Sequence, residues 1–414
     1  MQKFVLFCER YGVALAPICL ILAACGLWPE MELLVPSLPD MKQVFGVSDG
    51  QIQQLLTVNF VGFLIGVLIA GPLCDNVGRK TVLVGGALAY LISSFLSAMA
   101  PGFGFLMVSR FLQGFTMTGP LVAGVVLILE STSGIKQVFW MSLSNSAITL
   151  CMAAGPIVGS WINTGFGYQG NLWSILILGL VGLMPSFFFV SESLQKNKKR
   201  PFKVLQIFKG YFSLLRDWRF MCLAIPMCAI SAAYFIYVGV SALFMVDTLG
   251  IPASSFGRYQ GPIIGCFSIV SLSSSCLLQR FGLIRCITVG TAFSSLGCLL
   301  LLCMSLFFKE NAICTTVFMM LFASGMVPVC SLLFPYCVGH LPSELQGSAQ
   351  AMIQALRLFF TSLGTFILGF VYEGSLLPVT VMMSITLVIG IFLLWKGREF
   401  MRGELSTGTV MGAH

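Results

Sequence analysis

The chain has 414 residues, of which 57% are hydrophobic and only 9% are charged, and its mean hydropathy is +0.95. Soluble proteins carry about 25% charged residues, so this chain has too little polar surface for a water-soluble domain of its size. The composition excludes a disordered chain, a nucleic-acid-binding fold and a secreted disulfide scaffold, and it predicts a protein whose solvent is lipid.

A membrane-spanning helix needs about 20 mostly apolar residues, and twelve stretches of this chain qualify. The predicted fold is therefore an all-α polytopic membrane protein of twelve spans in two sets of six. The spans of the first set are 11–38, 51–73, 81–99, 103–129 and two within 137–191, divided by a break at 163–171. Those of the second set are 220–246, 259–279, 286–308, 312–336, 346–372 and 375–395.

One long polar segment separates the two sets. It predicts a first six-helix bundle at 1–195, a basic linker at 196–219 and a second six-helix bundle with a short tail at 220–414. Apolar residues recur at helical spacing among the Lys and Arg of the linker, which predicts a short amphipathic helix on the bilayer surface. They are Phe202, Leu205, Phe208, Phe212 and Leu215.

The basic residues predict the orientation of the spans. If the amino terminus is cytoplasmic, only Lys42, Arg258 and Lys309 of the 23 basic residues fall in segments on the opposite side. Because Lys and Arg concentrate on the cytoplasmic side of a membrane protein, we expect both termini there. The net charge of +8 is then a topological signal that requires no nucleic-acid partner.

Cysteine usage gives no sign of a metal or a cofactor. The 15 Cys are scattered singly with no CxxC pair, and the chain has only two His, so no adequate ligand set is present. The sequence also has no nucleotide-binding loop and no nucleophile constellation. We therefore expect neither an enzyme nor a bound cofactor.

The loop after the second span carries the most specific motif. The segment GPLCDNVGRKTVL resembles the signature of the major facilitator superfamily through Gly71, Leu73, Asp75, Gly78, Arg79 and Lys80. Asn76 stands where the family usually has a basic residue. A weaker copy, QRFGLIR, follows the eighth span with Gly282 in register with Gly78 at an offset of 204 residues, and this repeat supports two pseudo-equivalent bundles.

Further segments are similar to proton-coupled drug exporters of the bicyclomycin-resistance type. RFLQG (110–114) resembles the fourth-span motif of the family, and AGPIVG (154–159) resembles the antiporter motif of its fifth span through Gly155, Pro156 and Gly159. Glu32, four residues before Pro36, resembles the acid in the first helix of these exporters. The resemblance covers nearly the whole chain.

Four ionisable residues lie within the predicted spans, namely Glu30, Glu32, Arg110 and Arg357. Such residues are functional by default, because placing a charge in a span costs at least ~2.5 kcal/mol. Glu30 and Glu32 lie about 200° apart on a helix and cannot both face one cavity. The resemblance selects Glu32 as the proton carrier, with Glu30 as the alternative and Arg110 as the modulator. The competing interpretation places both acids at the outer water interface, where they merely end the helix.

The remaining polar and aromatic residues suggest a gate and a substrate site. The resemblance implies that Asp75 and Arg79, with Glu130, latch the two bundles on the cytoplasmic side, although a solvated topogenic loop also explains Arg79 and Lys80. Substrate contacts are expected from Gln113, which shares a helix face with Arg110, and from several aromatic residues. For Arg357, substrate contact and a structural pairing are equally compatible with the sequence. These residues are Gln113, Tyr234, Tyr237, Phe63, Phe334 and Arg357.

The sequence therefore predicts a monomeric carrier of the inner (plasma) membrane that exports small hydrophobic or cationic organic compounds in exchange for protons. One alternative is a carrier of the same fold for a siderophore, an amino acid or a sugar, working inward or as a facilitator. Another is a transport-inactive receptor or scaffold. The Gly-Pro motif of the fifth span favours the exporter.

Overall fold

The computed structural model describes residues 2–132, 134–192, 204–339, 341 and 343–406, and within these ranges it contains helices and no strand. The first half of the chain forms α1 (Gln2–Leu27), α2 (Glu30–Leu34), a 3-10 turn (Val35–Ser37), α3 (Leu38–Phe45), α4 (Asp49–Val77), α5 (Arg79–Ala98), α6 (Phe103–Ser131) and α7 (Gly134–Phe189). The second half forms α8 (Val204–Arg216), α9 (Trp218–Ala242), a π-helical turn (Leu243–Thr248), α10 (Ala253–Phe281), α11 (Leu283–Phe307), α12 (Ala312–Gly339), α13 (Ser343–Val371) and α14 (Leu377–Ser406).

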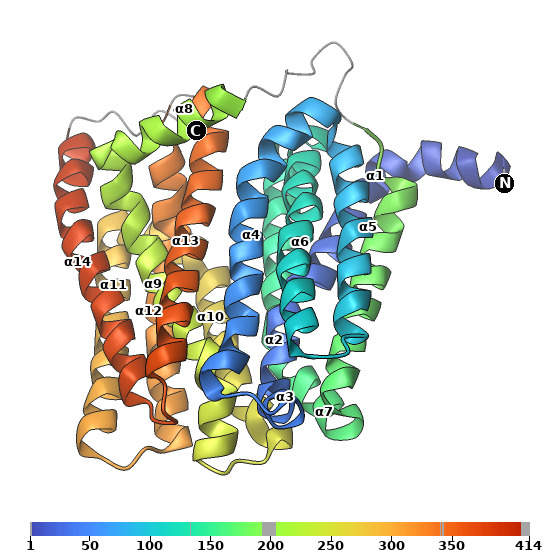
Figure 1. Cartoon of the computed structure of the whole chain (residues 1–414). Coiled ribbons are helices and arrows are strands. Elements are labelled where there is room, and N and C mark those ends of the chain that lie inside the picture. Colours follow the sequence, from blue (N-terminus) through green and yellow to red (C-terminus); the bar gives the residue numbers. More distant parts are fainter. Residues whose placement is uncertain (1, 133, 193–203, 340, 342, 407–414) are drawn as a thin grey trace.

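The helices form two groups that stand side by side (Figure 1). Helices α1 to α7 pack among themselves, as do α9 to α14, and the groups meet mainly where α4 packs on α13 and α7 packs on α10. We call these two contacts the seam. Helix α8 lies across one end of the molecule, the α8 end, and α3 lies at the opposite end, the α3 end.

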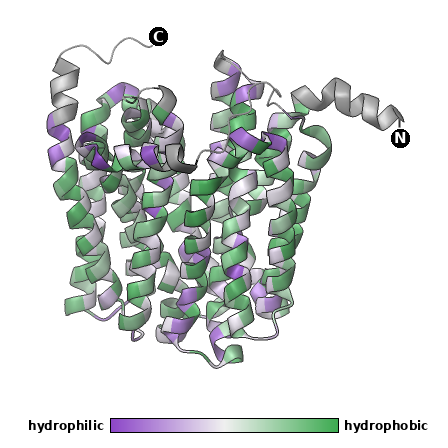
Figure 2. Ribbon diagram, turned by 45° about the horizontal axis from the view of Figure 1, so that its top comes forward, coloured by the Kyte–Doolittle hydropathy of each residue, from purple (hydrophilic) through white to green (hydrophobic). Residues whose placement is uncertain are grey.

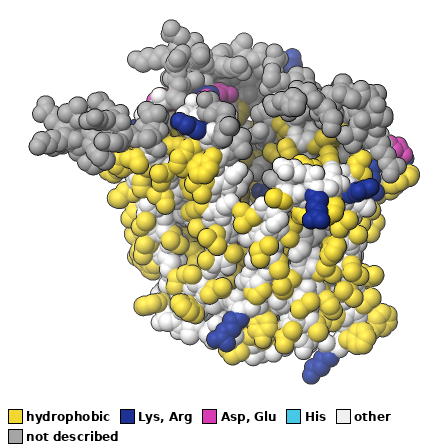
Figure 3. Space-filling model, turned by 180° about the vertical axis from the view of Figure 1, so that it is seen from behind, with side chains coloured by type: hydrophobic (Ala, Val, Ile, Leu, Met, Phe, Trp, Pro, Cys, Tyr) yellow, Lys and Arg dark blue, Asp and Glu magenta, His cyan; other side chains and the backbone are white. Residues whose placement is uncertain are grey.

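Apolar side chains cover the outer faces of both groups. Large residues such as Ile92, Val108, Ile269 and Val388 are more than 60% exposed, which is unusual for a protein surrounded by water. Figure 2 shows hydrophilic residues gathered at the two ends, and Figure 3 shows Lys and Arg near the ends with a hydrophobic band between them. This pattern fits a molecule embedded in a bilayer.

Ten helical stretches in the described part of the chain are long and apolar enough to cross a membrane. One of them, Phe139–Phe189, has 51 residues and contains a break at Gly167, whose φ of 65° is not helical. Helix α10 has 29 residues but is not among the ten. The predicted count of twelve thus depends on whether Phe139–Phe189 crosses twice and α10 crosses once.

The first predicted span differs from the structure. The sequence suggests one helix over 11–38, whereas α1 ends at Leu27 and the short helix α2 begins after Pro29. Proline lacks a backbone N–H and cannot continue a helix without losing a hydrogen bond. Pro29, Pro36 and Pro39 therefore divide this segment into α1, α2, the 3-10 turn and α3.

The linker region is described in part. Residues 193–203, including Phe202 and most of the predicted basic residues, lie outside the described residues, so the boundaries proposed at 195 and 219 remain a prediction. Helix α8 lies within the predicted amphipathic segment. Tyr211 and Leu214 are buried, and the Tyr211 hydroxyl donates to the Leu68 carbonyl of α4 at 3.3 Å, while Phe212 and Leu215 are exposed.

Candidate functional site

The break at Pro29 places two carboxylates in the interior of the molecule. Glu30 and Glu32 are 2% and 1% exposed, so the interpretation that both acids lie at the outer water interface is wrong. Because they are two residues apart in one helical turn, they face different neighbours. Glu30 points toward α4, α5 and α6, whereas Glu32 packs against α7.

Glu30 is fully engaged by partners from three helices. Its carboxylate forms an ion pair with Arg110 of α6 at 3.0 Å, and it accepts hydrogen bonds from the Asn59 amide at 2.8 Å and the Tyr90 hydroxyl at 2.9 Å. Arg110 is fully buried and also donates to Gln113 Oε1 at 2.7 Å. A buried ion pair is stable only when such hydrogen bonds satisfy the remaining polar atoms. The cation thus engages Glu30 and not the predicted Glu32.

Glu32 is equally buried but has no hydrogen-bond partner for either carboxylate oxygen among the described residues. A Cβ added to Gly155 would lie 2.6 Å from the Glu32 Cβ, and one added to Gly159 would lie 2.6 Å from the Leu33 carbonyl oxygen. The two glycines of the predicted antiporter motif therefore allow α7 to pack tightly on α2. Pro156, between them, lies within α7 at the seam, where its carbonyl would meet a Cβ on Gly257 of α10.

Buried polar groups without compensating partners lie on α4 of the first half and on α9 and α10 of the second half. Tyr234 of α9 contacts Gln260 of α10 and lies within electrostatic range of Glu32 and Tyr237. The Tyr237 hydroxyl and the amide groups of Gln53 and Gln260 are buried without a hydrogen-bond partner in the described part of the chain. Sequence reasoning missed both glutamines, because a search for charged residues in spans passes over neutral amides.

The other predicted substrate residues are distributed over the molecule. Gln113 belongs to the Arg110 network, where its amide also donates to the Ser94 hydroxyl at 2.8 Å. Phe63 is buried against Trp28, with ring centroids 6.0 Å apart, and Phe334 is half-buried on α12. Arg357 is half-buried on α13 and has no ion-pair partner among the described residues.

The signature loop forms a charge cluster at the α8 end, between α4 and α5. Arg79 binds Asp75 at 2.9 Å and Glu130 of α6 at 3.1 Å, and it donates to the Cys74 carbonyl at 3.0 Å. Gly78 provides the turn with a φ of 125°, which favours glycine. Gly71 lies one turn before Asp75, with open space around its Cα. These partners of Arg79 all belong to the first half of the chain.

Glu192 completes this cluster and was not predicted. Its carboxylate accepts hydrogen bonds from the backbone N–H groups of Arg79 at 2.9 Å and Lys80 at 3.1 Å. These N–H groups begin α5, where no carbonyl of the helix can accept them and the helix dipole attracts an anion. The end of α7 is thereby tied to the start of α5.

Contacts across the seam are close at the α3 end. Lys42 binds Asp49 of the first half at 2.7 Å and Asp247 of the second half at 2.8 Å. A Cβ on Gly50 of α4 would collide with the backbone of Gly369 in α13. In the nearby loop, burial raises the pKa of Glu310, which accepts a hydrogen bond from the Leu376 N–H at 2.7 Å.

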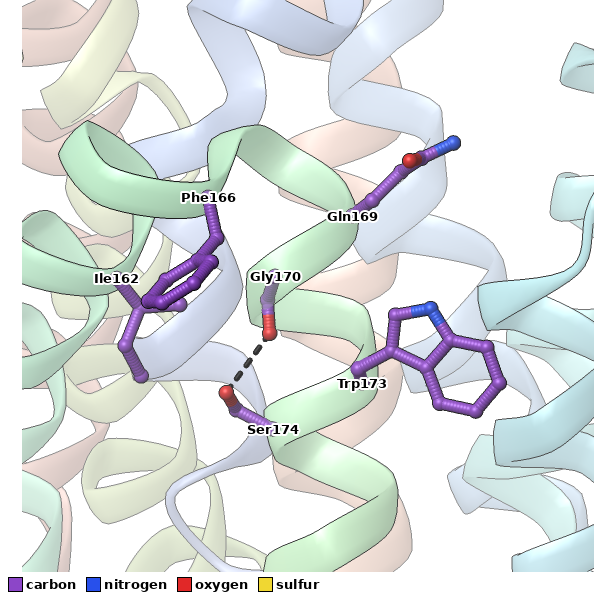
Figure 4. Close-up of a pocket in the computed structure, with 6 residues that line it drawn as sticks. All are labelled: Ile162, Phe166, Gln169, Gly170, Trp173 and Ser174. Atoms are coloured by element: carbon purple, nitrogen blue, oxygen red, sulfur yellow. Dashed lines mark hydrogen bonds between the residues drawn. The ribbon is translucent and has the colours of Figure 1, made fainter.

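A small surface pocket of about 350 Å³ lies elsewhere, around the break in α7. Figure 4 shows its six lining residues, among them Ile162, Phe166 and Trp173, all from the two arms of α7. Its lining includes no charged residue and none of the predicted substrate residues. No three His, Cys, Asp or Glu side chains gather into a metal-binding group in the part of the chain that the structure describes.

An apolar exterior, two packed groups of helices and a buried ion pair inside one group are features of a polytopic membrane protein. Residues 18–365 match the model of the Major Facilitator Superfamily, and the chain belongs to this family. This match confirms the family predicted from the signature loop, and the chain is a transporter rather than an enzyme.

Relatives and solved structures agree with this family. The chain is 26% identical to the uncharacterized MFS-type transporter YdgK of Bacillus subtilis, over 87% of this chain and 90% of YdgK. It is 25% identical to the multidrug resistance protein MdtL of Klebsiella pneumoniae, over 62% and 64% of the two chains. The structure resembles the human organic anion transporter MFSD10 (TM-score 0.66, 15% identity) and the nucleoside transporter NupG (0.69, 14%), each over 93% of this chain and 99% of the other.

Proposed function

We propose that the protein exports small organic compounds, hydrophobic or cationic, in exchange for protons by alternating access. The observation that carries this proposal is the contrast between the two buried acids. Glu30 is neutralised by Arg110, whereas Glu32 has no partner among the described residues and lies within electrostatic range of Tyr234 in the second half. A buried carboxylate without a fixed cation is a group that a proton and a cationic substrate can compete for. The relatives named for multidrug resistance, such as MdtL, support the same assignment.

The topology that we propose has twelve spans and both termini in the cytoplasm of a bacterial-type plasma membrane. The break at Gly167 supports two crossings by Phe139–Phe189, and the 29-residue length of α10 supports one more. The asymmetric distribution of Lys and Arg supports the orientation. The α8 end is then cytoplasmic, and the halves meet closely at the outer end through Lys42, Gly50 and Gly369. We propose that the protein works as a monomer.

In this mechanism the charge cluster around Arg79 latches the halves when the carrier opens outward. The described partners of Arg79 lie in the first half. The proposal therefore requires Asp75 or Arg79 to exchange at least one contact for a partner across the seam during the transition. Such an exchange of a charge network between two arrangements is a known basis of switching.

The test is uptake of the cationic dye rhodamine 123 into inside-out vesicles with an acidic interior. Vesicles with the wild-type protein should accumulate the dye, and collapse of the pH gradient should release it. Glu32→Gln should abolish the pH-driven component, because a neutral amide cannot carry the proton. Glu373→Gln makes the same chemical change at an exposed loop position and should transport as the wild type does. Gradient-driven uptake that survives Glu32→Gln contradicts the proposal, and dye movement without any gradient indicates a facilitator.

A further inference from the structure

The second half carries a basic residue that the proton-coupling scheme does not use. Arg357 lies on α13 in the same stripe as Thr361 and Thr365, because residues four apart share a helix face. Thr365 accepts a hydrogen bond from the Thr57 hydroxyl of α4 at 2.9 Å, across the seam. The stripe thus reaches the first half at Thr365, while Arg357, two turns before it, lies near Cys228 of α9 and Cys330 of α12.

No acid of the described residues compensates Arg357. No described carboxylate lies within ion-pair distance of its guanidinium group, and its Nε is buried without a hydrogen-bond acceptor. Its electrostatic neighbours are the thiols of Cys228 and Cys330. Arg110, the fully buried arginine of α6, has a carboxylate and an amide oxygen as partners. An unpaired arginine within a membrane is costly and marks a functional site.

Hydrogen-bond donors accompany this cation. The hydroxyls of Thr361, one turn from Arg357, and of its neighbour Ser362 are buried without a partner in the described ranges. A guanidinium group with adjacent hydroxyls is the donor set that suits a carboxylate or a similar oxyanion. The set contains no carboxylate, the group that would suit a second cation.

Helix α9 gives the separation between this site and Glu32. Glu32 is in electrostatic range of Tyr234, and Arg357 is in range of Cys228. The Cys228 thiol also donates to the Ile353 carbonyl of α13 at 3.3 Å, one turn before Arg357. Since Cys228 and Tyr234 are six residues apart, the α9 residues near the two charges are offset along the helix by about 9 Å, at 1.5 Å per residue.

We propose that the exported compound is amphoteric, with its anionic group bound by Arg357 and its cationic group near Glu32 of the opposite half. This inference rests on the proposed export function and specifies its substrate class. A compound of this kind compensates both charges at once, whereas a simple cation leaves Arg357 unpaired. Because the two charges belong to different halves, such a compound also bridges the seam.

The test compares two fluorescent dyes that differ in one group. Rhodamine 110 carries a carboxylate and a cationic ring system, and rhodamine 123 is its methyl ester, which keeps the cation alone. Binding to the purified full-length protein is measured by fluorescence polarisation at neutral pH, without a proton gradient. The wild type should bind rhodamine 110 more tightly, and Arg357→Gln should weaken that binding by about tenfold or more, as expected for the loss of a charge-assisted contact. In the same Arg357→Gln variant, the affinity for rhodamine 123 should change by less than about twofold.

Two further variants make the outcome specific. Arg357→Lys keeps the charge but loses the planar fork, so it should restore part of the rhodamine 110 affinity. Glu32→Gln should weaken the binding of both dyes. The proposal is overturned if Arg357→Gln lowers the affinity for both dyes equally, or lowers it for neither. A wild type that binds only rhodamine 123 overturns it while leaving the export function intact, and a wild type that binds neither dye counts against both.

Discussion

The two halves of the chain treat the cations within their helices differently. In the first half, Arg110 is paired with Glu30, and Arg79 is paired with Asp75 and Glu130. In the second half, Arg357 has no ion-pair partner among the described residues. A paired cation holds helices in fixed positions, while an unpaired one leaves its binding capacity for a ligand. The comparison suggests that the first half supplies the fixed framework and the second supplies part of the specificity.

The repeated loops show the same difference. Gly78 and Gly282 stand 204 positions apart, and both have a positive φ, of 125° and 76°. After Gly78 the backbone N–H groups of α5 are bound by Glu192, and Asp75 binds Arg79. In the second copy Gln279 occupies the place of Asp75 and cannot form that ion pair. The backbone of the repeat is kept, whereas the Asp–Arg pair of the first copy is not.

The largest effect is expected from breaking the buried pair of the first half. Arg110→Gln and Glu30→Gln should each lower the free energy of unfolding by about 3–5 kcal/mol, because each leaves a buried charge without its partner. The double variant should lose much less than the sum of the two. Thermal and denaturant unfolding of the purified protein measures all three.

Arg357→Gln is the control that sharpens the comparison. It removes a cation that has no described carboxylate partner, so its loss of stability should be far smaller than that of Arg110→Gln. Additive effects of Arg110→Gln and Glu30→Gln, or an equal loss in Arg357→Gln, contradict the distinction between the halves.

Much of the fold and family follows from local sequence patterns. The signature loop predicted the superfamily, and uncharged stretches placed most helices within a few residues of their observed ends; the predicted 312–336, for example, corresponds to α12 at Ala312–Gly339. Spacing also indicated that Glu30 and Glu32 face different neighbours. These features depend on periodicity and on residues close together in the chain, which the sequence displays directly.

The partners within the site depend on three-dimensional packing and were not predicted. The break at Pro29 sets the orientation of α2 and so brings Glu30 to Arg110, 80 positions away in the sequence. The predicted continuous helix over 11–38 does not contain this break. Glu192 reaches the start of α5 from the far end of α7, a sequence separation of 113 residues from Arg79. Gln53 and Gln260 become notable only once their burial and lack of described partners are known.

A smaller effect is expected at the start of α5. Glu192→Gln should lower the free energy of unfolding by about 1 kcal/mol, because the charged acceptor of the helix N-terminus becomes a neutral amide. Unfolding of the purified variant measures the loss, and Glu373→Gln, at an exposed loop residue, should be neutral. High salt should reduce the effect of Glu192→Gln. Equal stability of the two variants contradicts a role for Glu192 in fixing the first copy of the repeat.

The smallest effect concerns the contact between the halves at the α3 end, where Lys42 binds one carboxylate of each half. Both ion pairs are partly exposed, with side-chain exposures of 25–30%, so each is worth only about 0.2–1 kcal/mol. Asp247→Asn removes the bond across the seam, whereas Asp49→Asn removes the bond within the first half. Amide hydrogen exchange at Gly369–Val371 of α13, which faces Gly50, should therefore accelerate up to about fivefold in Asp247→Asn and remain unchanged in Asp49→Asn. Equal acceleration in both variants contradicts a bond that holds the two halves together. The difference should shrink in 1 M salt, since screening acts strongly on such exposed pairs.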